Sequence, residues 1–175
     1  MQRSTTRAMS QSDAHLHLSP TRIEMPLEIR VYIVALLNQT LAETVDLRSH
    51  VKQAHWNMKG PEVFLLQTLL ATLATELDAY TDQVAARITA LGGVAQGTAR
   101  LAVTQSTLAE YPSDLGESTA LVRALAERLA HCATMVRANI THATDVEDVH
   151  TAHLYIDIAR GIETRLGGLE AYLAQ

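Results

Sequence analysis

The hydrophobic positions along the chain recur every three to four residues in long stretches. The first stretch runs from Leu27 to about Trp56, and its apolar positions are Ile29, Ile33, Leu36, Leu37, Leu41, Val45 and Leu47. This spacing places apolar side chains on one face of an α-helix. The pattern therefore predicts a first long helix that buries one face.

Glycine and proline divide the rest of the pattern into three more long helices. Pro61 follows Gly60 and opens a second helix that runs to about Leu91, because proline suits the first helical turn. A third helix is predicted over residues 117–142. Its apolar face consists of Leu121, Leu125, Leu129, Cys132, Val136 and Ile140. A fourth helix follows the acidic residues at 145–148, which favour a helix N-terminus, and it runs to about Leu173.

The connection between the second and third helices spans residues 92–116. Its length of about 25 residues exceeds the ~2–8 residues usual between helices of a bundle. A short helix is predicted inside it near Gln105–Glu110, before Tyr111-Pro112. One long crossover in a four-helix bundle is typical of ferritin-like proteins. The sequence thus predicts an all-α, ferritin-like four-helix bundle whose crossover contains a short helix.

Composition and charge narrow the range of functions. Residues 1–25 are rich in Ser, Thr and Gln, which predicts a flexible tail before one domain over residues 26–175. The net charge of −5 argues against a surface that generally coats nucleic acid. Cys132 is the one cysteine, and a lone thiol is typical of a reducing compartment. Since no apolar run approaches the ~18–20 residues that span a bilayer, we expect a cytoplasmic protein without membrane contact.

Three segments resemble the Dps family of mini-ferritins. Residues 52–60, KQAHWNMKG, closely resemble the family hallmark at the end of the first helix. The segments DQVAAR at 82–87 and ALGGVAQGT at 90–98 give a second match. A weaker third match is LGGLEAYL at 166–173, where the family usually has an aromatic pair in place of Gly167-Gly168.

This resemblance implies a homo-oligomer, a dodecameric cage around a central cavity. Such cages oxidise ferrous iron, preferably with hydrogen peroxide, and store the ferric product, and many members bind and shield DNA. The implied iron site is shared across a two-fold interface. One subunit contributes two histidines and an aspartate, and the other contributes an aspartate and a glutamate.

Two of the five implied iron ligands are present in this chain. His55 matches the first histidine and Asp82 matches the partner subunit's aspartate, but the other three positions are Gln67, Ala71 and Ala86. Iron prefers imidazole and carboxylate ligands, so we expect slow or rearranged ferroxidase activity. Two interpretations remain open, a functional metal site and an inter-subunit hydrogen-bonded pair. At the level of the whole protein, the alternative function is a non-catalytic cage that sequesters a transition metal or serves a structural role.

Asp78 is the candidate replacement for a missing carboxylate. It lies one helical turn before Asp82 and therefore on the same stripe of the second helix. The alternative interpretation is a solvated or cavity-lining charge.

A second candidate metal site lies at the start of the fourth helix. Glu147, His150, His153 and Asp157 follow one another at spacings of three, three and four residues, which predicts one helical stripe. In the Dps family this region lines pores on the three-fold axes, so symmetry would multiply the imidazoles into a site for zinc or a similar ion. The alternative is a surface helix start whose acidic residues favour the helix dipole.

The remaining candidates concern DNA and packing. Arg3, Arg7 and Arg22 in the tail make a poor phosphate clamp alone, but twelve copies on one cage would add avidity for DNA. Trp56 and Phe64 are expected in the core or in an interface, and Cys132 is expected as a buried, inert thiol.

Overall fold

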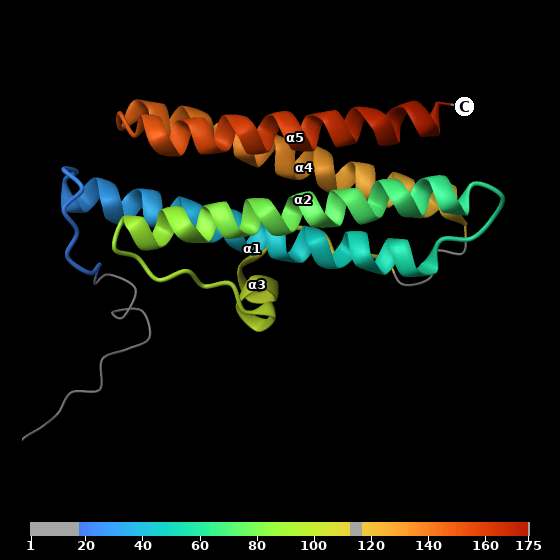
Figure 1. Ribbon diagram of the computed structural model, residues 1–175, viewed down its shortest axis with the longest axis horizontal. Coiled ribbons are helices and arrows are strands. Elements are labelled where there is room, and N and C mark those ends of the chain that lie inside the picture. The colour runs from blue at the N-terminus through green and yellow to red at the C-terminus, as the bar shows by residue number, and fades with distance from the viewer. Residues whose placement is uncertain (1–17, 113–116, 175) are drawn as a thin grey trace, which may run out of the picture.

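The computed structural model describes residues 18–112 and 117–174. Five helices lie within these residues: α1 (Leu27–Asn57), α2 (Val63–Ala90), α3 (Ala99–Gln105), α4 (Ser118–Asp145) and α5 (Val149–Leu173). The four long helices lie side by side, and α3 projects from the crossover (Figure 1). This arrangement confirms the all-α bundle with a short helix in the crossover. Across both described ranges, no helix is at once long and apolar enough to span a membrane.

The helices form two pairs joined by the crossover. α1 packs mainly on α2, and α4 packs mainly on α5. The crossover leaves α2 at Gly92, which adopts a positive φ of 84°, a conformation that glycine adopts at little cost. A Cβ atom at this position would lie 2.3 Å from the carbonyl oxygen of Ser19. The turn therefore requires glycine for both backbone conformation and space.

The core of the bundle is mainly apolar, and one hydrogen-bonded network within it joins α1 to α5. Leu37, Leu70 and Leu125 are fully buried. Tyr155 is also fully buried, and its hydroxyl lies 3.1 Å from Thr40 Oγ1. Because Thr40 Oγ1 donates to the backbone carbonyl of Leu36 at 3.0 Å, the tyrosine is the donor in this pair. A polar group buried in this way costs little free energy because its partners are present.

The short helix lies earlier in the crossover than the sequence pattern predicts. It occupies Ala99–Gln105, where the side chain of Thr98 caps it by accepting from the backbone N–H of Leu101. The predicted segment 105–110 is not helical beyond Gln105 because the next backbone groups bind elsewhere. The backbone N–H of Thr107 donates to the side chain of Glu43 at 2.8 Å.

The described part of the predicted tail packs on the end of α2. The backbone N–H of Ser19 donates to Gly92 O at 2.7 Å, and the hydroxyl of Thr21 donates to Ala90 O at 3.3 Å. These two contacts attach the end of the predicted tail to α2, and the flexibility of residues 1–25 remains a prediction. Of the three candidate DNA-binding arginines, Arg22 is exposed, and Arg3 and Arg7 lie outside the described residues.

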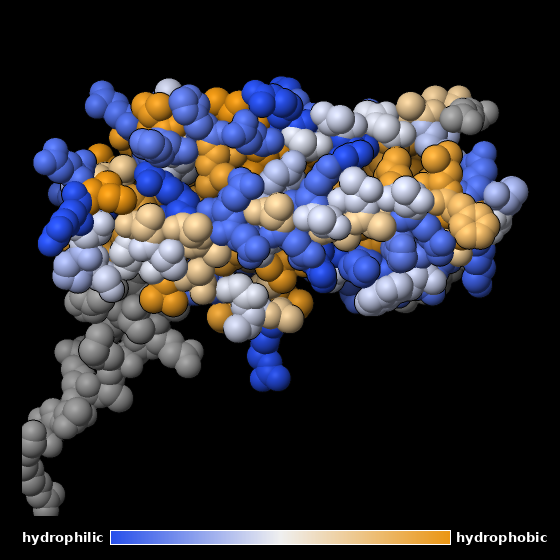
Figure 2. Space-filling view, viewed as in Figure 1, coloured by the Kyte–Doolittle hydropathy of each residue, from blue (hydrophilic) through white to orange (hydrophobic). Residues whose placement is uncertain are grey.

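The two aromatic residues expected inside the protein are exposed in the isolated chain. Trp56 is 66% exposed and Phe64 is 81% exposed. Hydrophobic side chains reach the surface at the end of the bundle where α1 and α2 meet (Figure 2). Placement in the core is therefore wrong, and placement in an interface remains a prediction. Cys132 is buried as expected, and burial raises the pKa of its thiol.

Candidate metal site

His55 lies in the last turn of α1, beside the start of α2. The side-chain amide of Gln67 on α2 donates to the backbone carbonyl of His55 at 3.3 Å. The Nδ1 atom of His55 is buried and has no hydrogen-bond partner among the described residues. The structure therefore brings His55 together with the position that would carry the second histidine, and here that position supplies an amide.

Asp82 lies far from His55 within one chain. It is exposed on α2, as are Ala71 and Ala86. Gln67 contacts His55, and Asp82 follows Gln67 by about 15 residues, roughly 22 Å along a helix at ~1.5 Å per residue. A site that contains both His55 and Asp82 therefore needs two copies of the chain.

The candidate replacement ligand Asp78 is paired with an arginine. Its Oδ1 atom lies 2.5 Å from Arg48 Nε on α1, and both side chains are about half exposed, at 53% and 42%. An exposed pair of this kind adds only ~0–1 kcal/mol of stability. Its chemical consequence is larger, because a guanidinium beside the carboxylate opposes the approach of a metal cation.

The candidate residues at the start of the fourth helix do not all lie on one helix. His150, His153 and Asp157 are exposed on α5. Glu147 precedes the helix and has a positive φ of 60°. The prediction that Glu147 shares the helical stripe is therefore wrong, because the chain changes direction at this residue. Asp157 is exposed and pairs with Arg160 at 3.2 Å.

The turn between α4 and α5 explains the position of Glu147. Its backbone N–H donates to Thr144 O at 2.9 Å, and the next N–H, of Asp148, donates to Ala143 O at 2.9 Å. These two bonds form a Schellman motif, which closes the C-terminus of α4 with a left-handed residue. The side chain of Asp148 then caps α5 by accepting from the N–H of Thr151 at 3.0 Å.

Metal-ligating side chains do not cluster within one copy over residues 18–112 and 117–174. Over the described ranges, no three His, Cys, Asp or Glu side chains are placed so that they could hold a metal ion. A metal site made from the candidate residues therefore requires side chains from further copies.

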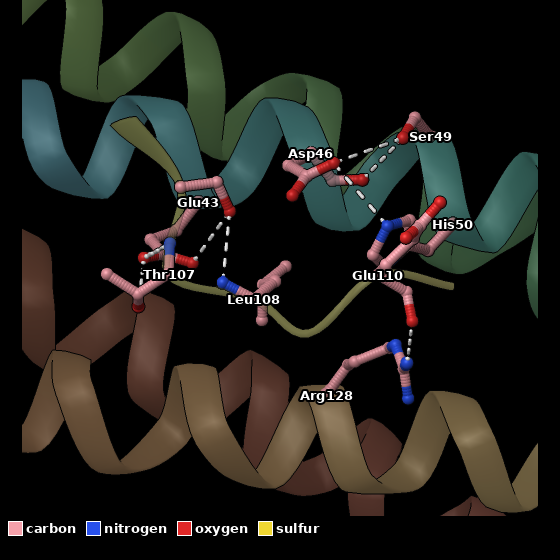
Figure 3. Close-up of polar contacts among 9 residues, drawn as sticks. Glu43, Asp46, Ser49, His50, Thr107, Leu108, Glu110 and Arg128 are labelled. Carbon is pink, nitrogen blue, oxygen red and sulfur yellow. Dashed lines mark hydrogen bonds and ion pairs between the residues drawn. The ribbon is translucent and has the colours of Figure 1, made fainter. Parts of the chain in front are cut away.

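Sequence reasoning missed a buried carboxylate at the crossover. Glu43 on α1 is fully buried and accepts from the N–H of Thr107 at 2.8 Å and from its hydroxyl at 2.6 Å. It also accepts from the side chain of Gln39 at 3.0 Å, and it lies between the crossover and α1 (Figure 3). One signal for it was available in the sequence: Glu43 is an acidic residue in the first helix between the apolar positions Leu36 and Leu47. Glu43 attaches the crossover to α1, so its carboxylate is not free to bind a metal.

Comparison with known proteins identifies the class of fold. A family model described as the ferritin-like domain matches residues 34–175. DpsC from Streptomyces coelicolor has a similar structure, with a TM-score of 0.86, 26% identity, and coverage of 90% of this chain and 92% of that one. DpsA14 from the same organism gives a TM-score of 0.82 at 28% identity, with coverage of 89% and 94%. The chain is therefore a ferritin-like protein.

Curated relatives narrow this class to one family. The DNA protection during starvation protein of Agrobacterium fabrum is 33% identical over 155 residues, which cover 89% of this chain and 96% of the relative. The protein of the same name from Brevibacillus brevis is 27% identical, with coverage of 85% and 99%. The chain belongs to the Dps family, as the segments around His55 and Asp82 predict.

Proposed function

We propose that the chain is a subunit of a homo-oligomeric Dps cage that takes up iron and protects the cell, including its DNA, from oxidative stress. Its iron site is shared between subunits and has lost most of its ligands. Family membership and the placement of His55 and Asp82 support this proposal. The observation with most weight is that these two residues lie too far apart to act within one copy.

The chemistry of the remaining residues predicts slow oxidation. His55 of one copy and Asp82 of a second copy supply one imidazole and one carboxylate. Ferric iron, the oxidised product, carries one more positive charge than ferrous iron and needs further carboxylates to balance it. Ala71 and Ala86 supply none, and Gln67 supplies at most a neutral carbonyl oxygen. Iron is therefore the substrate of a site that binds it weakly.

A second candidate function is a non-catalytic cage that sequesters a transition metal. The Arg48–Asp78 ion pair favours this second function. Asp78 is the candidate replacement ligand on the same stripe as Asp82, and its carboxylate is already paired. The exposed histidines His150 and His153 would then be the better metal ligands, since imidazole suits zinc and similar ions.

The initial rate of ferrous oxidation with hydrogen peroxide separates the two functions. The wild-type assembly is expected to oxidise iron slowly but above the buffer background. The triple variant with Gln67→His, Ala71→Asp and Ala86→Glu is expected to be at least about tenfold faster, because it restores the charge balance. The same three changes in a His55→Ala background serve as the matched control and should give little gain. A wild-type rate equal to buffer would favour the non-catalytic cage.

The cage itself is tested by light scattering. We expect a stable dodecamer near neutral pH. A stable monomer or dimer would contradict the cage and both candidate functions with it.

A further inference from the structure

A pocket of about 380 Å³ lies beside α1, and none of the candidate iron ligands lines it. It is formed by the second half of α1 and the end of the crossover, and its chemically distinctive lining residues are Arg48, Ser49, His50, Lys52, Trp56 and Tyr111. None of the described residues that line it is acidic. The pocket therefore presents basic and aromatic groups to whatever occupies it.

Two buried polar atoms at this pocket have no hydrogen-bond partner in the part of the chain that the structure describes. His50 is only 8% exposed, and its Nδ1 atom makes no hydrogen bond with the described residues. The hydroxyl of Tyr111 is buried and unpartnered in the same way. The two rings are in contact, with centroids 5.3 Å apart. Because an unsatisfied buried polar group costs ~1–3 kcal/mol, these atoms point to a bound polar species.

The surrounding side chains determine the charge that this species should have. The other ring nitrogen of His50, Nε2, faces Asp46 Oδ1 at 3.5 Å (Figure 3). Lys52 Nζ lies 5.6 Å from the centroid of the Trp56 ring. The Arg128 guanidinium, which does not line the pocket, lies 5.5 Å from the centroid of the Tyr111 ring. The two carboxylates close to the lining residues already have partners, Asp46 beside His50 and Asp78 beside Arg48. The remaining charge on the lining is the cation of Lys52, so the pocket favours an anion.

We propose that this pocket binds a small tetrahedral oxyanion, a phosphate group either as the free ion or as part of a nucleotide. His50 Nδ1 and the Tyr111 hydroxyl donate hydrogen bonds to it, Lys52 supplies charge, and Trp56 lies beside it. This assignment is independent of the proposed iron chemistry. It explains why the polar atoms of His50 and Tyr111 are buried at a pocket wall.

Binding should be linked to protonation of His50. Burial lowers the pKa of His50, the Asp46 carboxylate opposes this, and the Arg128 guanidinium lowers the pKa further. Burial raises the pKa of Tyr111 to about 12, so its hydroxyl remains a neutral donor near pH 7. With Nε2–H directed at Asp46, Nδ1 donates to an anion only in the imidazolium form. An oxyanion therefore favours the protonated ring, and its affinity should fall as pH rises.

Trp56 provides a direct readout, because it is the only tryptophan in the chain. We would titrate sulfate, whose charge is constant near neutral pH, into the assembled protein and follow Trp56 fluorescence against chloride at equal ionic strength. We expect a saturable change with sulfate only, with tighter binding at about pH 6 than at about pH 8. A sulfate response equal to that of chloride would overturn the proposal.

Three variants test the assigned contacts. His50→Gln, Tyr111→Phe and Lys52→Gln are each expected to weaken sulfate binding about tenfold or more. Tyr111→Phe removes one oxygen and keeps the ring contacts, so it remains informative if His50→Gln does not fold. Lys59 is an exposed lysine outside this pocket, so Lys59→Gln is the matched control and should bind like wild type. Unchanged affinity in Tyr111→Phe and Lys52→Gln would overturn the assignment.

The source of the phosphate group is tested by comparing inorganic phosphate with adenosine monophosphate. Tighter binding of the nucleotide would support a nucleotide ligand that also contacts Trp56. Binding of inorganic phosphate alone would support the free ion. Binding of neither would contradict the proposal.

Discussion

Arg87 on α2 binds the buried carboxylate of Asp148, the residue that caps α5. Its Nη2 atom lies 2.7 Å and 3.0 Å from the two carboxylate oxygens, and its Nε donates to the hydroxyl of Thr151 at 2.9 Å. The Asp148 residue is only 2% exposed. The pair therefore connects the two halves of the bundle at the α4–α5 turn, next to the candidate histidines.

Loss of the Asp148 carboxylate should destabilise the protein strongly. Asp148→Ala removes the helix cap and leaves Arg87 without its partner, so we expect a loss of about 3 kcal/mol. Asp145→Ala is the control, because Asp145 is exposed in the last turn of α4, and it should change stability by less than about 0.5 kcal/mol. Chemical denaturation at one fixed protein concentration measures both. Equal effects of the two changes would show that the pair has no special role.

The same pair predicts a pH dependence of stability. Burial alone raises the pKa of Asp148, but hydrogen bonds from Thr151 and Arg87 outweigh it and hold the pKa below its usual value. A carboxyl whose pKa is lower in the folded state stabilises above its unfolded pKa, about 3.9, and loses this contribution as pH falls towards the folded value. The stability difference between wild type and Asp148→Asn should therefore be constant near neutral pH and shrink below about pH 4. A difference that grows on acidification would contradict this sign.

Glycines in α5 should respond to alanine substitution in opposite directions. Gly167 and Gly168 have open space where a Cβ atom would be added, so Gly167→Ala and Gly168→Ala should each stabilise by up to about 1 kcal/mol. At Gly161 the added Cβ would lie 1.8 Å from the Tyr80 hydroxyl. Gly161→Ala should therefore destabilise, because the tyrosine must move. Melting temperatures of the assembled variants test this, and a stabilising Gly161→Ala would contradict the packing.

The histidines of α5 should bind zinc if symmetry copies bring them together. Calorimetric titration should show zinc binding that is lost in the His150→Ala, His153→Ala double variant and nearly unchanged in His55→Ala. The cage should survive the double change, since both side chains are exposed. Because zinc needs neutral imidazoles, affinity should weaken as pH falls through about 6.5. Equal affinity in wild type and the double variant would identify these residues as ordinary surface histidines.

The sequence predicts the fold well because long helices depend on periodic apolar positions. The apolar positions Ile33, Leu37 and Leu41 recur at helical spacing, and all three are buried. The crossover is less predictable because its conformation depends on the buried side chain of Glu43, which belongs to another element. The spacing of Glu147 from His150 predicts one helical stripe, but Glu147 has a left-handed backbone conformation. It therefore lies in the turn between α4 and α5 and outside both helices.

The candidate site is predictable only in part. The segment around His55 identifies the family, but local sequence does not show that Arg48 pairs with Asp78 across two helices. The Arg87–Asp148 pair was likewise missed, although the spacing from Asp148 to Thr151 is that of a helix cap. Contacts between distant segments arise from packing, and one sequence does not specify which polar partners meet.

Anomalous diffraction from iron-soaked crystals tests the shared, degenerate site most directly. The account predicts a weak iron peak between His55 of one copy and Asp82 of a neighbouring copy, and a strong peak there in the variant with Gln67→His, Ala71→Asp and Ala86→Glu. A fully occupied wild-type site at that position would contradict the claim that the site is degenerate. Iron bound by side chains of a single copy would contradict the claim that it is shared.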